Sequence, residues 1–185
     1  FIMVLANGNI FISTSRLVSE ETGCGNRNYT VIMRYSLSFS LALSFFFMLL
    51  SFVFAKKISL LSGGKTDLSA PIRLIALSLP FAAVGSCIKG YFNAVRKVNI
   101  PCLGDVTEFA AKWTALLISV VFLIDRGYDI YILIAASILL GEFVSLIFYL
   151  VKYASEYVGF YRLPCAKPKL DRFGKYLKLS LPILA

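Results

Sequence analysis

Long apolar stretches alternate with short polar segments along most of the chain. Stretches poor in charge cover residues 35–55, 71–95, 105–124 and 130–151. Each is close to the roughly 20 residues that a helix needs to cross a bilayer. The pattern therefore predicts four complete membrane-spanning helices in an all-α, polytopic helix bundle.

Both ends of the chain are apolar but too short to span a membrane. Residues 1–13 lack the basic start and the small-residue cleavage site of a signal peptide, so we interpret them as the end of a helix. Residues 179–185 resemble the beginning of another helix. The basic segment 152–178, which contains Pro164 and Pro168, is predicted to be a linker that separates it from helices within residues 1–151.

The stretch 105–124 has two chemically different faces when it is drawn as a helix. Its three charged residues, Asp105, Glu108 and Lys112, fall within one narrow arc. The small residues Ala115 and Ser119 share that side, and the opposite side is apolar: Val106, Ala110, Trp113, Leu117 and Val121. A charged face cannot face lipid, so we expect it to face other helices or a water-filled cavity.

Two further patterns concern the neighbouring spans. Glu142 is the only charged residue of its span, and a carboxylate there must be either protonated or paired. It is a candidate proton or ion site, with a purely structural role as the alternative. Small residues recur at a spacing of four in two other spans: Ser36, Ser40 and Ser44; Ala82, Ser86 and Gly90. Both sets predict close helix contacts, and for the three serines a pathway lining is the alternative.

Composition places the protein in a membrane and leaves little for catalysis. The chain is 58% hydrophobic and 16% charged, with a mean hydropathy of +0.78, which is typical of an integral membrane protein. It contains no histidine, so we expect no enzyme activity, no catalytic residues, no cofactor and no metal site. Four scattered cysteines are expected to be reduced: Cys24, Cys87, Cys102 and Cys165.

The net charge of +9 is explained by the orientation of the chain rather than by nucleic acid. Most of the 19 lysines and arginines lie in or beside the segments 14–34, 89–104 and 152–178. Positively charged loops stay on the cytoplasmic side, so these segments are predicted to be cytoplasmic. We therefore predict a multi-pass protein of the cell membrane without a nucleic-acid partner.

Several motifs, taken in order, resemble a known family. They are Ser-Arg-Leu-Val-Ser-Glu-Glu at 15–21, Leu-Pro-Phe at 79–81, Lys-Gly-Tyr-Phe-Asn-Ala-Val-Arg-Lys at 89–97, and Glu108-x-x-x-Lys112. Nearly the whole chain resembles the polysaccharide-biosynthesis and stage V sporulation protein B branch of the MOP flippase superfamily. The resemblance implies a MATE-like N-terminal lobe that runs from part of the second helix to the sixth. The first helix and the C-terminal lobe would then be missing partners.

The resemblance also implies a function. A lipid-linked saccharide has an anionic head that cannot cross about 30 Å of hydrocarbon unaided. A flippase would move a polyprenyl-pyrophosphate oligosaccharide or a peptidoglycan precursor by alternating access, in contact with membrane lipids. We predict a substrate pathway in which Arg16, Lys89 and Lys112 attract the pyrophosphate, while Asp105 and Glu108 set the local charge.

Four alternatives stay open at this point. The site at 108–112 can be an intrahelical ion pair, since lysine lacks the bidentate fork of the arginine expected there. Arg16 and Lys89 can be interface anchors. The protein can be a multidrug or cation antiporter of the same superfamily, in which buried carboxylates are central, or a scaffold for envelope enzymes that transports nothing.

Overall fold

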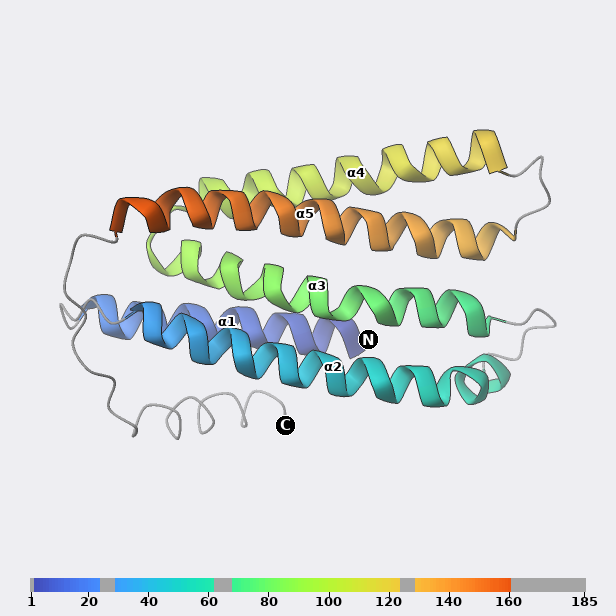
Figure 1. Ribbon diagram of the computed structural model, residues 1–185, viewed down its shortest axis with the longest axis horizontal. Coiled ribbons are helices and arrows are strands. Elements are labelled where there is room, and N and C mark those ends of the chain that lie inside the picture. Colours follow the sequence, from blue (N-terminus) through green and yellow to red (C-terminus); the bar gives the residue numbers. More distant parts are fainter. Residues whose placement is uncertain (1, 24–28, 62–67, 124–128, 161–185) are drawn as a thin grey trace.

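The computed structural model describes residues 2–23, 29–61, 68–123 and 129–160. These residues form five α-helices, which confirms the predicted all-α fold (Figure 1). The helices are α1 (Ile2–Gly23), α2 (Tyr29–Leu61), α3 (Ser69–Ala94), α4 (Asn99–Leu123) and α5 (Ile130–Phe160).

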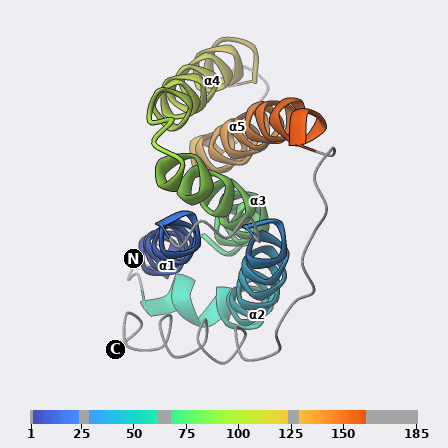
Figure 2. The same cartoon turned by 90° about the vertical axis from the view of Figure 1, so that its left-hand side faces the viewer.

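Helix α3 lies at the centre of the bundle. It packs against each of the other four helices, with α1 and α2 on one side and α4 and α5 on the other (Figure 2). Its sequence suits this position, because residues along most of its length are buried and Pro80 lies within a continuous helix. The helix therefore has two interfaces, and they differ in chemistry.

The interface of α3 with α1 and α2 is closely packed. The Cys87 thiol forms hydrogen bonds with the Ser36 hydroxyl at 3.1 Å and with the Ser40 hydroxyl at 3.3 Å, and all three side chains are buried. A Cβ atom added to Gly90 would lie only 2.8 Å from the carbonyl oxygen of Phe11. Ser36, Ser40 and Gly90 thus serve close helix contacts, as predicted. Ala82 and Ser86 also line a small pocket towards α4 and α5.

The helices extend beyond the apolar stretches that predicted them. Residues 15–21, which we expected in a loop, continue α1 to Gly23, because Thr14, Leu17 and Val18 are buried at helical spacing. Likewise α2 covers 29–61, and α5 continues to Phe160 into the segment predicted as a linker. A charged residue ends the part of a helix that suits lipid, but it does not end the helix itself.

A four-residue turn at 95–98 joins α3 to α4, in place of the predicted cytoplasmic loop at 89–104. Arg96 has a φ angle of 63°, and its N–H donates to the Asn93 carbonyl at 3.1 Å. The Lys97 N–H donates to the Phe92 carbonyl at 2.9 Å. These bonds form a Schellman motif, which ends α3 beyond Lys89. Pro101 lies in the first turn of α4, where a proline is tolerated.

Three of the described helices are long and apolar enough to cross a membrane: Met33–Leu60, Ser69–Ala94 and Ile130–Ser155. Within the described residues α4 is not among them, because its first half carries Asp105, Glu108 and Lys112. Its 25 residues nevertheless lie alongside α5 over much of the bundle (Figure 1). A membrane-spanning role for α4 stays a prediction.

Successive helices alternate in direction. The C-terminal ends of α1, α3 and α5 and the N-terminal ends of α2 and α4 lie at one end of the bundle (Figure 1). The described parts of the three segments predicted to be cytoplasmic lie at or beside this end. Residues 161–185, and with them most of the predicted linker and the start of a further helix, lie outside the described residues.

Replacing Arg96 with glycine should stabilise the protein. A residue with a side chain is strained at a positive φ angle by roughly 1–2 kcal/mol, so Arg96→Gly should raise the free energy of unfolding by about 1 kcal/mol. The control is Lys97→Gly, one residue further along the same exposed turn. It relieves no strain and should lower stability. Thermal unfolding of the intact protein in detergent measures the stability of both variants. Equal changes in the two variants would contradict the backbone strain at Arg96.

Candidate functional site

A chain of ion pairs links α3, α4 and α5. The Lys89 Nζ atom lies 2.5 Å from an Asp105 carboxylate oxygen and 3.4 Å from one of Glu108. The Lys112 Nζ atom lies 2.6 Å from Glu108 and 3.0 Å from Glu142. Each lysine therefore bridges two carboxylates, and Glu108 connects the two lysines.

Hydroxyl groups of α5 complete this network. The Ser145 hydroxyl donates to the Glu108 carboxylate at 3.2 Å. The Tyr149 hydroxyl donates to the Pro101 carbonyl at 3.1 Å and lies 3.5 Å from Asp105. The Lys89 ammonium also lies 5.3 Å from the centre of the Tyr149 ring, within range of a cation–π interaction. The fully buried Tyr149 side chain thus holds the start of α4 against α5.

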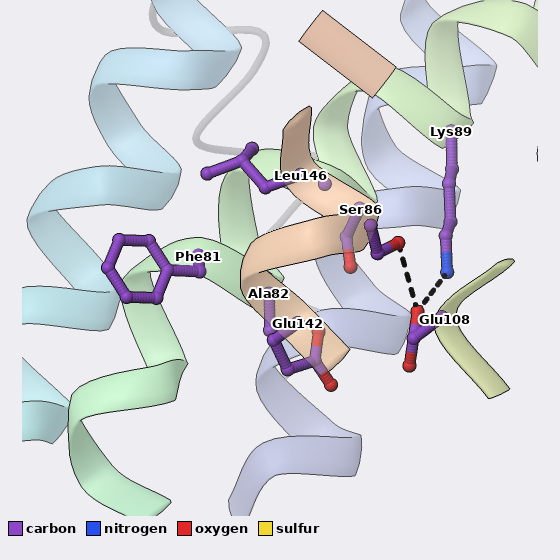
Figure 3. Close-up of a pocket in the computed structure, with 9 residues that line it drawn as sticks. Phe81, Ala82, Ser86, Lys89, Glu108, Glu142 and Leu146 are labelled. Carbon is purple, nitrogen blue, oxygen red and sulfur yellow. Dashed lines mark hydrogen bonds and ion pairs between the residues drawn. The ribbon is translucent and has the colours of Figure 1, made fainter. Parts of the chain in front are cut away.

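A small pocket of about 130 Å³ lies beside the charged network. Figure 3 shows the carboxylates of Glu108 and Glu142 and the ammonium of Lys89 at its edge, with Ser86 nearby. The lining comes from α3, α4 and α5: Phe81, Ala82, Gly85, Ser86, Lys89, Glu108, Glu142, Ser145 and Leu146. A polar pocket of this size has room for a few water molecules.

The two faces of α4 lie as its sequence predicts. Glu108 and Lys112 face α3 and α5, with side-chain exposures of 19% and 29%, whereas Asp105 lies at the edge with 62%. The apolar side is exposed on the outside of the bundle: Val106, Ala110, Trp113, Leu117 and Val121. An outward apolar face is expected in lipid, and the inward face supplies the charges of the site.

The structure brings together five of the six residues predicted for the pathway and the ion site: Lys89, Asp105, Glu108, Lys112 and Glu142. Arg16 is not brought to this cluster. It is exposed on α1, because its neighbours Leu17 and Val18 face the core. Its role in a substrate pathway stays a prediction.

Two open questions about pairing have structural answers. Glu142, expected to be protonated or paired, is paired with Lys112 from the neighbouring helix. The intrahelical pair Glu108–Lys112 also forms. Three carboxylates share two lysines, so the cluster as a whole carries one more acid than base.

Ser145 and Tyr149 belong to the site but were not predicted from the sequence. They follow Glu142 at spacings of three and seven, so all three residues lie on one face of α5. That spacing was the available signal. Serine and tyrosine are common in apolar helices, and only their hydrogen-bond partners on α4 distinguish these two from the rest.

Two of the cysteines lie in the described residues, and both are free thiols. Cys87 is buried and Cys102 is exposed, whereas Cys24 and Cys165 lie outside the described residues. Within that part of the chain, no group of three or more histidine, cysteine, aspartate or glutamate side chains could hold a metal ion. The site therefore offers charge and hydrogen bonds as its chemistry.

The fold and the site together define a class of protein. Several membrane-length helices pack around a charged site with a small pocket, which is the arrangement of a multi-pass membrane transporter. The chain belongs to the MatE family, whose model matches residues 1–103. The match covers α1, α2, α3 and the start of α4, and it includes Lys89 but not the carboxylates of the site. No curated protein and no solved structure matched the chain.

Removing the shared lysine should destabilise the bundle. Lys112→Met would leave Glu108 without its closest partner and Glu142 without its ion pair. The loss should be below the roughly 3–5 kcal/mol that breaking a fully buried pair costs, because both carboxylates keep some exposure. Thermal unfolding of the intact protein tests this. Adding Glu142→Gln to Lys112→Met should restore part of the loss, and a further loss would contradict the pairing.

Proposed function

We propose that this transporter is a flippase that moves a lipid-linked saccharide, of the polyprenyl-pyrophosphate type, across the cell membrane. The observation that carries the proposal is the placement of two lysines, Lys89 and Lys112, beside a polar pocket between apolar helices. A charged lysine within a membrane is energetically costly, and it is found there mainly where it has a partner or a function. The resemblance of the motifs at 79–112 to the polysaccharide branch supports the same function.

The site suits an anionic head with a lipid tail. The pyrophosphate would bind to Lys89 and Lys112, while the tail stays in the bilayer beside the exposed apolar face of α4. The charged and apolar faces lie on opposite sides of α4. The head group inside the bundle and the tail in the lipid would therefore lie on the two sides of this one helix. The resemblance implies that a second lobe closes the other side of the pathway.

The carboxylates would hold the site between transport events. With no substrate bound, Glu108 and Glu142 keep Lys112 paired, which lowers the cost of a charged lysine among apolar helices. A pyrophosphate would then compete with these carboxylates for the ammonium. Such an exchange is easier to reverse than capture by an unpaired lysine, and a carrier must release what it binds.

Native mass spectrometry of the intact protein, purified with its membrane lipids, tests the proposal. The wild type should retain a polyprenyl-pyrophosphate saccharide, and both Lys112→Ala and Lys89→Ala should lower the bound fraction several-fold. Losing a charge-assisted hydrogen bond to a phosphate costs about 1.5–3 kcal/mol, which is roughly a tenfold or larger loss of affinity. Lys56→Ala, an exposed lysine of α2 outside the site, is the matched control.

The same measurement can reject the proposal. If no such lipid is retained, or if it is retained equally by wild type, Lys112→Ala and Lys89→Ala, the site does not bind the pyrophosphate. Neutral detergent washing of each sample at the same ionic strength keeps the comparison valid, because binding through charges weakens with salt.

A cation or drug antiporter is the second candidate, and one observation favours it. The site contains three carboxylates and only two lysines, and Glu108 and Glu142 line the pocket themselves. An organic cation would then compete with Lys112 for the carboxylates. Under this function Glu142→Gln should weaken saturable binding of an organic cation, whereas under the flippase function it should leave the lipid bound.

A further inference from the structure

We propose that Gly141 is a positioning residue for Lys112. The absence of a side chain at position 141 lets the lysine cross α5 and bridge Glu108 on its own helix to Glu142 on the next. The consequence for transport rests on the function proposed above, but the positioning itself does not. Gly141 is neither charged nor part of the pocket lining, so its role is indirect.

The contact involves most of the lysine side chain. A Cβ atom built on Gly141 would overlap the Cγ atom of Lys112 and would lie 3.0 Å from Cε and 3.1 Å from Cδ. The methylene stem therefore lies flat on the glycine backbone, and the Nζ atom beyond it lies 3.0 Å from Glu142. Moving these three successive methylene carbons aside requires new side-chain torsions, which would shift the Nζ atom from its place beside Glu142.

A reciprocal contact fixes the register of the two helices. On α4, a Cβ atom built on Gly104 would overlap the hydroxyl group and ring of Tyr149 from α5. Gly104 and Lys112 are eight residues apart on α4, and Gly141 and Tyr149 are eight residues apart on α5. In an antiparallel pair these contacts lie in the same register, about 12 Å apart along the helices. Each helix thus offers one glycine to a long side chain of the other.

This register determines which carboxylates Lys112 can reach. Glu108 lies one turn away on the same helix and stays within reach whatever stands at position 141. Glu142 is reached only across α5. A methyl group at position 141 should therefore break the interhelical pair Lys112–Glu142 and leave the intrahelical pair Lys112–Glu108. Lys112 would then pair only within α4.

Gly85 provides a matched control for the cross-linking ratio, on the neighbouring helix α3. A Cβ atom built on Gly85 would lie 3.8 Å from the nearest side-chain atom, Cδ2 of Tyr149, which is an ordinary contact. Like Gly141 it is a buried glycine within a helix, so both substitutions change the intrinsic helix propensity equally. Only the substitution at position 141 should displace a lysine.

Zero-length cross-linking of the intact protein measures the two ion pairs separately. A membrane-permeable carbodiimide activates a carboxylate, the neighbouring lysine amine attacks it, and an isopeptide bond forms as the urea leaves. In wild type, peptide mass spectrometry should find Lys112 joined to Glu142 and to Glu108. In Gly141→Ala the Lys112–Glu142 product should fall several-fold while the Lys112–Glu108 product is kept. Gly85→Ala should retain the wild-type ratio.

The ratio separates positioning from a general structural role. A loss of both products in equal measure, or a wild-type ratio in Gly141→Ala, would overturn the proposal. If Gly141→Ala does not fold, the double variant Gly141→Ala with Lys112→Ala decides, since the colliding stem is then absent. A double variant that folds as well as Lys112→Ala alone supports the proposal, and a double variant that folds less well than Lys112→Ala rejects it.

The outcome is independent of the substrate. If Gly141→Ala loses the Lys112–Glu142 product but the wild type retains no lipid-linked saccharide, the positioning stands and the flippase function fails. If the saccharide is retained by wild type and the cross-linking ratio does not change in Gly141→Ala, the flippase function stands and the positioning role of Gly141 fails. Under both proposals together, Gly141→Ala should also lower the retained lipid.

Discussion

The pairing of Lys112 with two carboxylates is the interaction on which the charged half of this structure depends. A charge among apolar helices is costly, and three neighbouring charges are tolerated only because each has a partner of opposite sign. The need for partners orients α4 with its charged face inward, brings α5 against it, and excludes this face from lipid. The other half of the bundle is held by a different chemistry, in which hydroxyl groups, a thiol and a glycine let α1, α2 and α3 pack closely.

Much of the fold follows from the sequence because its physical cause is local. The spacing of apolar stretches predicts where helices lie, and the 100° rotation per residue places Glu108 and Lys112 on one side of α4. The predicted choice for Glu142, protonated or paired, rests on the cost of an isolated carboxylate in lipid and needs no knowledge of the fold. These conclusions require only the chain itself and the nature of the membrane.

The rest depends on how helices lie against one another, which no local pattern contains. The partner of Glu142 follows from the register of α4 and α5, and this register depends on two glycines and the side chains they receive. Tyr149 was missed for the same reason, since its partners are on α4. The sequence pattern misplaces the ends of α1 and α5. The first charged residue marks where a segment no longer suits the lipid interior, but the helix itself continues beyond it. Arg16 has a basic side chain like Lys89, yet it lies on the exposed face of another helix.

The short turn between α3 and α4 limits the shapes that the site can adopt. Only residues 95–98 separate the two helices, and four residues span at most about 14 Å when fully extended. The adjoining helix ends must therefore stay close together in every conformation, as two rods do when they are joined at one tip. Any widening between α3 and α4 has to grow with distance from that tip, so a large gap between these two helices can open only towards their far end. The turn thus gives the site a geometric polarity that its charges alone do not possess.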